Sequence, residues 1–141
     1  MSGRVFIDTN VLIYAHDIQA GRKQETATGI LGQLWETRTG VLSTQVLQEF
    51  YVNVTRKIHT PLKRSTARDI VRQYSVWPVI GPDADMIFRA SELEESHQLS
   101  FWDAMIVAAA RQAGATKILT EDLNHGETID GVTIENPFVG G

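Results

Sequence analysis

The segment from Arg4 to Tyr14 reads RVFIDTNVLIY, and it decides the fold. Its short apolar run from Val5 to Ile7 consists of strand-forming residues and is typical of a buried strand. Asp8 follows directly, at the carboxyl end of that strand, where ligands bind in open α/β folds. Thr9 belongs to the residue types that cap helices, and we expect it to cap a first helical turn over residues 11–13. The segment therefore predicts a central strand with an acidic site at its end.

The length and composition are those of an ordinary globular chain. It has 141 residues, 43% hydrophobic and 21% charged, which suits one domain over residues 1–141 with a sizeable core. No apolar run could span a bilayer and the N-terminus lacks a signal-peptide pattern, so we expect a cytoplasmic protein. The absence of cysteine excludes disulfides and thiolate metal sites. The net charge of −4 weighs against a large phosphate-binding surface but leaves room for a local basic patch.

Strand-like and helix-like segments alternate along the chain. Short apolar runs predict strands at residues 5–7, 41–43, 76–80, 117–120 and 132–134. Apolar residues at helical spacing predict helices over 24–39, 45–57, 65–74, 84–97 and 100–113. We expect Gly40 to cap the first of these helices, Pro78 to mark an edge strand and Ile87 to face inward. The alternation predicts a three-layer α/β/α sandwich around a central, mostly parallel sheet.

Four acidic residues fall where such a sheet would gather them. Asp8 ends the first strand, Asp122 follows the fourth, Asp103 opens a helix, and Glu49 lies in the helix after the second strand. Glu49 and Asp103 border apolar positions, where a carboxylate is costly to bury unless it is paired or metal-bound. Each acid alone has an ordinary explanation as a helix cap, a first-turn acid, a surface residue or a turn residue. Their combination at one sheet edge indicates a site.

Carboxylates that meet in one cleft either raise each other's pKa values or hold a hard cation. Ligation by oxygen alone suits Mg²⁺ or Mn²⁺. Such a cation can bind a phosphate oxygen, generate hydroxide from water and stabilise a leaving oxygen. The acidic set therefore favours metal-assisted phosphodiester hydrolysis.

Four segments of the chain resemble the PIN-domain ribonucleases, and most of all the VapC-type toxins of bacterial and archaeal toxin–antitoxin pairs. They occur in family order and span nearly the whole chain: Phe6–Leu12, Gln48–Phe50, Ser100–Ile106 and Leu119–Leu123. The resemblance implies a PIN fold and endonucleolytic cleavage of RNA that depends on Mg²⁺ or Mn²⁺. It also implies a homodimer and inhibition by a partner antitoxin.

The same resemblance assigns the site residue by residue. Asp8 and Asp103 would bind the metal directly, and Asp122 directly or through water. Glu49 would bind through water or act as the general base. Thr120 would support the last acid and Asn10 would orient Asp8. The remaining acid of the segment, Glu121, is expected to point elsewhere.

Basic residues suggest where RNA or a partner binds. Arg64, Arg68 and Arg72 fall at i, i+4 and i+8, one stripe of a helix, which can contact RNA phosphates or an acidic antitoxin segment. A solvated face is the alternative, and for Arg72 the preferred one. Arg22 and Lys23 form a smaller basic spot, expected in a loop beside the proposed site.

Two other functions are weighed against the ribonuclease. A non-catalytic PIN-fold module would bind RNA or a protein without cutting; the acidic net charge leaves room for it, and the intact acidic set argues against it. A phosphotransfer protein would also carry an acid after its first strand. Phosphatases of that type need a second Asp where this chain has Asn10, and a receiver needs a late Lys after a strand, whereas Lys117 precedes one.

Overall fold

The computed structural model describes residues 3–139, which form alternating strands and helices as predicted. The strands are β1 (Arg4–Ile7), β2 (Gly40–Ser43), β3 (Val79–Ile80), β4 (Ala115–Leu119), β5 (Thr128–Ile129) and β6 (Val132–Glu135). The helices are α1 (Thr9–Ala15), α2 (Arg22–Thr37), α3 (Thr44–Arg56), α4 (Arg64–Tyr74), α5 (Ala84–His97) and α6 (Phe101–Gln112). Within these residues no helix is long and apolar enough to cross a membrane.

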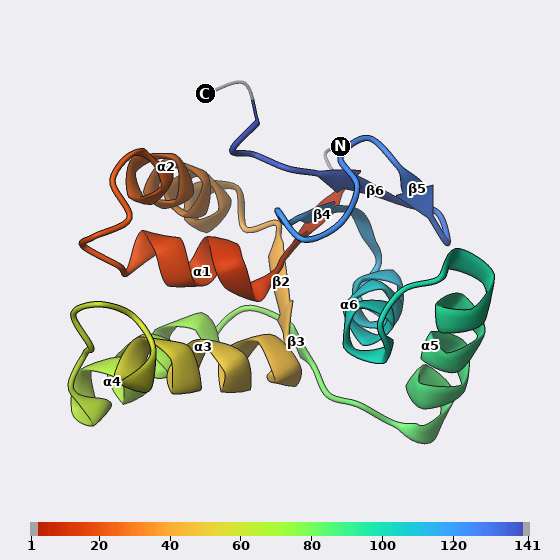
Figure 1. Cartoon of the computed structure of the whole chain (residues 1–141), viewed down its shortest axis with the longest axis horizontal. Coiled ribbons are helices and arrows are strands. Elements are labelled where there is room, and N and C mark those ends of the chain that lie inside the picture. Colours follow the sequence, from red (N-terminus) through yellow and green to blue (C-terminus); the bar gives the residue numbers. More distant parts are fainter. Residues whose placement is uncertain (1–2, 140–141) are drawn as a thin grey trace.

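The strands form one sheet in the order β3-β2-β1-β4-β6-β5. Every neighbouring pair is parallel except β5 with β6, so the prediction of a mostly parallel sheet is confirmed. Helices α1 to α4 cover one face, and α5 and α6 cover the other (Figure 1). Strand β1 lies between β2 and β4, which confirms its predicted central place and puts the residue after it in the middle of the sheet edge.

The core explains why these short strands are so apolar. Phe6 and Ile7 of β1, Leu42 of β2 and Ile118 of β4 are fully buried, because helices cover both faces of the sheet. On the second face, α6 buries every residue from Ala104 to Ala110. The three consecutive alanines of that run have small side chains, which let the helix axis approach the sheet closely.

The predicted cap of α2 and the predicted start of β3 are wrong. Arg38, in the left-handed conformation, caps α2, and Gly40 is instead the first residue of β2. A Cβ atom on Gly40 would lie 2.5 Å from the ring of Trp77, so close packing accounts for the glycine. The strand predicted over 76–80 shortens to Val79–Ile80, since backbone turns after α4 engage Val76 and Trp77. It is an edge strand, as Pro78 indicated.

Two further differences concern the second half of the chain. Ile87 was expected to face inward, but it is 46% exposed at the surface of α5. Strand β5 was missed because it has only two residues. The signal that reveals it is Asp130-Gly131: both have positive φ, 53° and 83°, as a tight two-residue hairpin turn requires.

Candidate active site

Asp8 lies at the carboxyl edge of the sheet, between β1 and α1. Its backbone N–H continues the β1–β4 pairing by donating to the carbonyl of Leu119, at 3.0 Å. Its side chain caps α1: Oδ1 accepts from the N–H of Thr9 and Oδ2 accepts from the hydroxyl of Thr120, each at 2.7 Å. The expectation that Thr9 is the cap is therefore wrong, since Thr9 is already the first residue of the helix.

Burial sets the charge state of this acid. Asp8 is only 5% exposed, and the loss of water around its carboxylate raises its pKa to about 6. The hydrogen bonds from Thr120 and Thr9 oppose this rise, whereas the negative charges of Asp122 and Glu49 reinforce it. An acid buried at a sheet edge beside other acids is the electrostatic setting in which a cation is stabilised.

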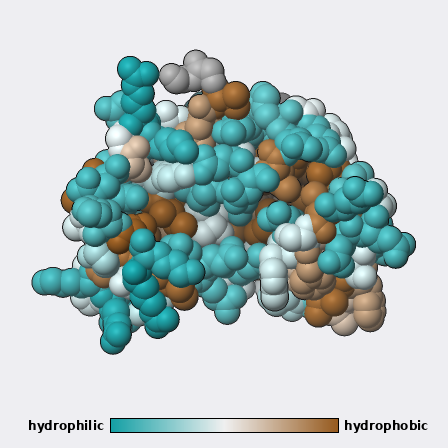
Figure 2. Space-filling model, in the orientation of Figure 1, coloured by the Kyte–Doolittle hydropathy of each residue, from teal (hydrophilic) through white to brown (hydrophobic). Residues whose placement is uncertain are grey.

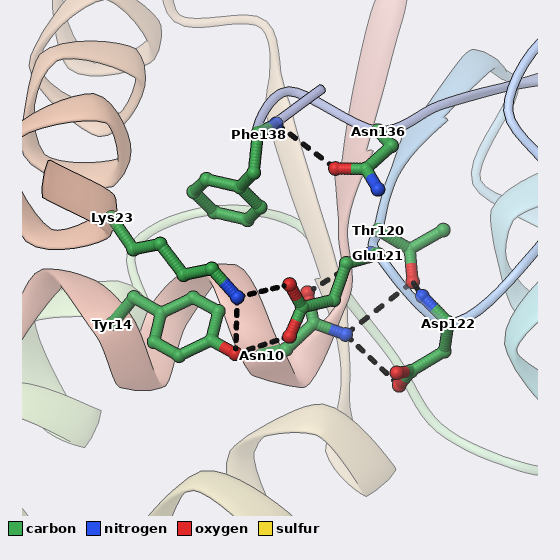
Figure 3. Close-up of polar contacts among 8 residues, drawn as sticks. All are labelled: Asn10, Tyr14, Lys23, Thr120, Glu121, Asp122, Asn136 and Phe138. Atoms are coloured by element: carbon green, nitrogen blue, oxygen red, sulfur yellow. Dashed lines mark hydrogen bonds and ion pairs between the residues drawn. The ribbon is translucent and has the colours of Figure 1, made fainter. Parts of the chain in front are cut away.

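The side chain of Asn10, predicted to orient Asp8, contacts Asp122 and Thr120. Its Nδ2 donates to Oδ2 of Asp122, at 2.9 Å, and more distantly to the hydroxyl of Thr120, at 3.4 Å (Figure 3). Thr120 contacts Asp8, and its hydroxyl also accepts from the N–H of Asp122, at 3.0 Å. Asn10, on α1, thus holds Asp122, which follows β4, and Thr120, which follows β4, holds Asp8, which precedes α1.

The other two acids approach from the helices. Glu49 is exposed on α3, and its Oε1 accepts from the hydroxyl of Thr9, at 2.8 Å. Asp103 is half-buried in the first turn of α6, where its N–H donates to Ser100 at 3.1 Å. Burial raises the pKa of Asp103, the Ser100 hydrogen bond lowers it, and the charge of Asp122 raises it. Asp122 therefore acts electrostatically on both Asp8 and Asp103.

The donor set consists of carboxylates, which are the ligands that Mg²⁺ and Mn²⁺ prefer. As the side chains stand, no three Asp, Glu or His residues within 3–139 are grouped closely enough to hold a metal ion. Two of the acids are held by neighbouring polar side chains, Asp122 by Asn10 and Glu49 by Thr9. The set fits a hard cation in chemistry and charge.

The basic residues singled out in the sequence lie on two helices. All three arginines of the predicted stripe are exposed on α4, and Arg72 pairs with Asp69 at 3.0 Å on the open surface. Lys23 does not lie in a loop: it belongs to the first turn of α2, and its Nζ lies 2.9 Å from Oε2 of Glu121. Sequence reasoning missed this pair, because residues 98 positions apart leave no local pattern.

The family model of the PIN domain matches residues 5–129. A match over most of the length settles the class, and the chain belongs to the PIN-domain family. No curated protein sequence matches it closely enough to be counted as a relative.

Solved structures agree with this class at the level of the fold. The chain is similar to VapC20 of Mycobacterium tuberculosis, described as a sarcin-ricin loop cleaving toxin, with 24% identity, a TM-score of 0.64 and coverage of 84% of this chain and 91% of that one. It is also similar to a toxin–antitoxin complex from Klebsiella pneumoniae, with 23% identity, a TM-score of 0.67 and coverage of 95% and 98%. A third match is DNA-bound VapBC from Salmonella typhimurium, with 20% identity, a TM-score of 0.67 and coverage of 96% and 99%.

Proposed function

We propose that the protein is a metal-dependent endoribonuclease that hydrolyses RNA phosphodiester bonds and acts as the toxin of a toxin–antitoxin pair. Membership of the PIN-domain family supports the nuclease class. The observation that carries the proposal is the environment of Asp8: it is buried at the carboxyl edge of the sheet, and its pKa is raised by burial and by the charges of Asp122 and Glu49. A carboxylate that burial has deprived of water is stabilised by a bound cation.

Mg²⁺ or Mn²⁺, when bound, would supply Lewis acidity and lower the pKa of a coordinated water. Asp8, Asp103 and Asp122 would hold it. Thr120 would keep Asp8 in place through its hydroxyl, and Asn10 would do the same for Asp122 through its amide. Glu49, exposed and hydrogen-bonded through one oxygen to Thr9, would hold the attacking water or take its proton.

Partners follow from the same class. Structures similar to this chain include complexes described as toxin with antitoxin, and we propose an antitoxin protein and a second copy of this chain as partners. Arg64 and Arg68, exposed on α4, would contact RNA phosphates. A small neighbouring gene for a DNA-binding protein that co-purifies with this chain would support the toxin role.

The nuclease is tested by incubating purified protein with RNA and Mg²⁺ or Mn²⁺. Cleavage should require the metal and should be lost in Asp8→Asn and in Asp103→Asn. Cleavage that survives both chelation and these substitutions would contradict the proposal.

A non-catalytic PIN-fold module is the second candidate. It is favoured by one observation: among residues 3–139 no three Asp, Glu or His side chains are grouped closely enough to hold a metal ion. Calorimetric titration with Mn²⁺ separates the two functions. The nuclease predicts binding that Asp8→Asn abolishes, whereas a binding-only module need not take up metal.

A further inference from the structure

Glu121, immediately before Asp122, is held by one residue from α1 and one from α2. Its Oε1 accepts from the hydroxyl of Tyr14, on α1, and its Oε2 accepts from Nζ of Lys23, on α2, at 2.9 Å (Figure 3). Lys23 also donates to the Tyr14 hydroxyl, at 3.3 Å, which closes the triangle. Both oxygens of this carboxylate are therefore engaged within the protein.

Aromatic rings cover the triangle. Phe138 packs edge-on against Tyr14, with ring centroids 5.2 Å apart and planes at 89°. Lys23 Nζ lies 4.8 Å from the centroid of the Tyr14 ring and 5.7 Å from that of Phe138. The Lys23 side chain is 45% exposed, so water screens this ion pair, and the cation–π contacts with the two rings add to the attraction. The side chain of Glu121 is 22% exposed, which is consistent with this cover.

The triangle connects to the acidic site through one side chain. The N–H of Glu121 donates to Oδ1 of Asn10, at 3.3 Å, while Nδ2 of the same Asn10 donates to Oδ2 of Asp122, at 2.9 Å. Glu121 is thus fixed through its carboxylate by α1 and α2 and through its backbone by Asn10. The next residue of the loop is the acid that Asn10 orients.

We propose that Tyr14, Lys23 and Glu121 are positioning residues that fix the loop after β4 and so set the place of the Asp122 carboxylate. The consequence for metal binding rests on the function proposed above. Residues that hold metal ligands from outside the first coordination sphere change metal affinity about 10- to 100-fold when they are replaced. Lys23, far from the acids in sequence, should therefore affect Mn²⁺ affinity without touching the ion.

The test compares Lys23→Met with two control variants. Lys117→Met removes a second exposed ion pair, in which Lys117 of β4 lies 3.4 Å from Glu135 of β6. The side-chain exposures are 39% for Lys117 and 43% for Glu135, against 45% for Lys23 and 22% for Glu121. Lys23→Arg keeps the charge and the reach. Two quantities are measured for each protein: the exchange rates of the Glu121 and Asp122 amides by NMR, and Mn²⁺ affinity by calorimetry.

In Lys23→Met we expect faster exchange at both amides and about tenfold weaker Mn²⁺ binding. Lys117→Met should match the wild type in both, and Lys23→Arg should lie near it. Unchanged exchange in Lys23→Met would overturn the proposal whether or not the protein binds Mn²⁺. Faster exchange with unchanged Mn²⁺ affinity would overturn it too, since the triangle would then only tie the loop to the fold.

A wild type that binds no Mn²⁺ would contradict the proposed function itself. The amide exchange rates would still decide whether the triangle holds the loop.

Discussion

At the scale of the residue, Asp8 combines a structural cost with a proposed role. Its pKa of about 6 lies above the ordinary value of 3.8, so the folded chain binds this proton more tightly than the unfolded chain. The cost of the ionised carboxylate is absent below pH 4, grows as the pH rises toward 6, and is then constant, on the order of 3 kcal/mol. A bound cation would offset this cost.

Asp8→Asn should therefore separate stability from activity. At pH 7 without metal we expect the variant to be at least as stable as the wild type, because the buried charge is gone, although an amide cannot accept both hydrogen bonds. Urea unfolding with a chelator measures the difference. Cleavage and Mn²⁺ binding should be lost. A variant that unfolds much more easily at pH 7 would show that the carboxylate stabilises the metal-free fold.

Thr120 offers a second test at this scale, because its hydroxyl donates to Asp8 and accepts from the Asp122 amide. Thr120→Val keeps the shape and removes both bonds, at a cost of about 1–3 kcal/mol for the buried groups left unsatisfied. We also expect Mn²⁺ affinity to fall about tenfold. Thr120→Ser retains the hydroxyl and is the matched control. Equal Mn²⁺ affinities for the two variants would exclude the supporting role.

At the scale of the element, the sequence predicted what apolar patterning determines. Strands β1, β2 and β4 lie where short apolar runs predicted them, and α5 and α6 begin within one residue of their predicted starts, after the side-chain caps Asp83 and Ser100. Patterning also placed the acids after β1 and β4 at one edge. It could not predict that Asn10 contacts Asp122 and that Thr120 contacts Asp8, because these contacts depend on side-chain rotamers and on the path of the loop after β4.

The β5–β6 hairpin shows how one turn residue ties elements together. Nε of Arg89, on α5, donates to Oδ2 of Asp130 at 3.0 Å, and Arg111, on α6, donates to its backbone carbonyl at 2.7 Å. The Arg89 hydrogen bond holds the pKa of Asp130 below its ordinary value, and burial opposes this shift. The stabilisation is therefore full above about pH 4 and is lost as the pH falls through the lowered pKa.

Asp130→Asn tests this tie, and it keeps the positive φ of 53°, which asparagine tolerates. Thermal unfolding should show a lower midpoint than the wild type at pH 7. The gap between the two proteins should close as the pH falls below 4. A gap that is the same at pH 7 and pH 3 would mean that the charge of Asp130 contributes nothing to the fold.

At the scale of the whole molecule, hydrophilic side chains cover most of the face in Figure 2, and apolar surface is broken into separate patches. The largest apolar side chains left exposed on α5 and α6 are Phe88, at 64%, and Trp102, at 63%. The proposed homodimer gives such side chains a place to be buried. Sedimentation or light scattering would report the mass of the free protein, and a dimer is expected.

Metal binding should also be visible in the stability of the whole chain. A ligand that binds only the folded state at a hundred times its dissociation constant adds about 2.7 kcal/mol. Mn²⁺ should therefore raise the unfolding midpoint of the wild type by several degrees. Asp8→Asn and Asp103→Asn should show no such rise. An equal rise in all three proteins would place Mn²⁺ somewhere other than the acidic site.

The measurement that tests the central claim most directly is cleavage of RNA by the wild type and by Asp103→Asn, side by side, with Mn²⁺ and with a chelator. We predict defined cleavage products only for the wild type with Mn²⁺, and intact RNA in the other three reactions. Equal cleavage by the two proteins, or cleavage by the wild type that the chelator leaves unchanged, would contradict the assignment of this acidic sheet edge as a metal-dependent nuclease site.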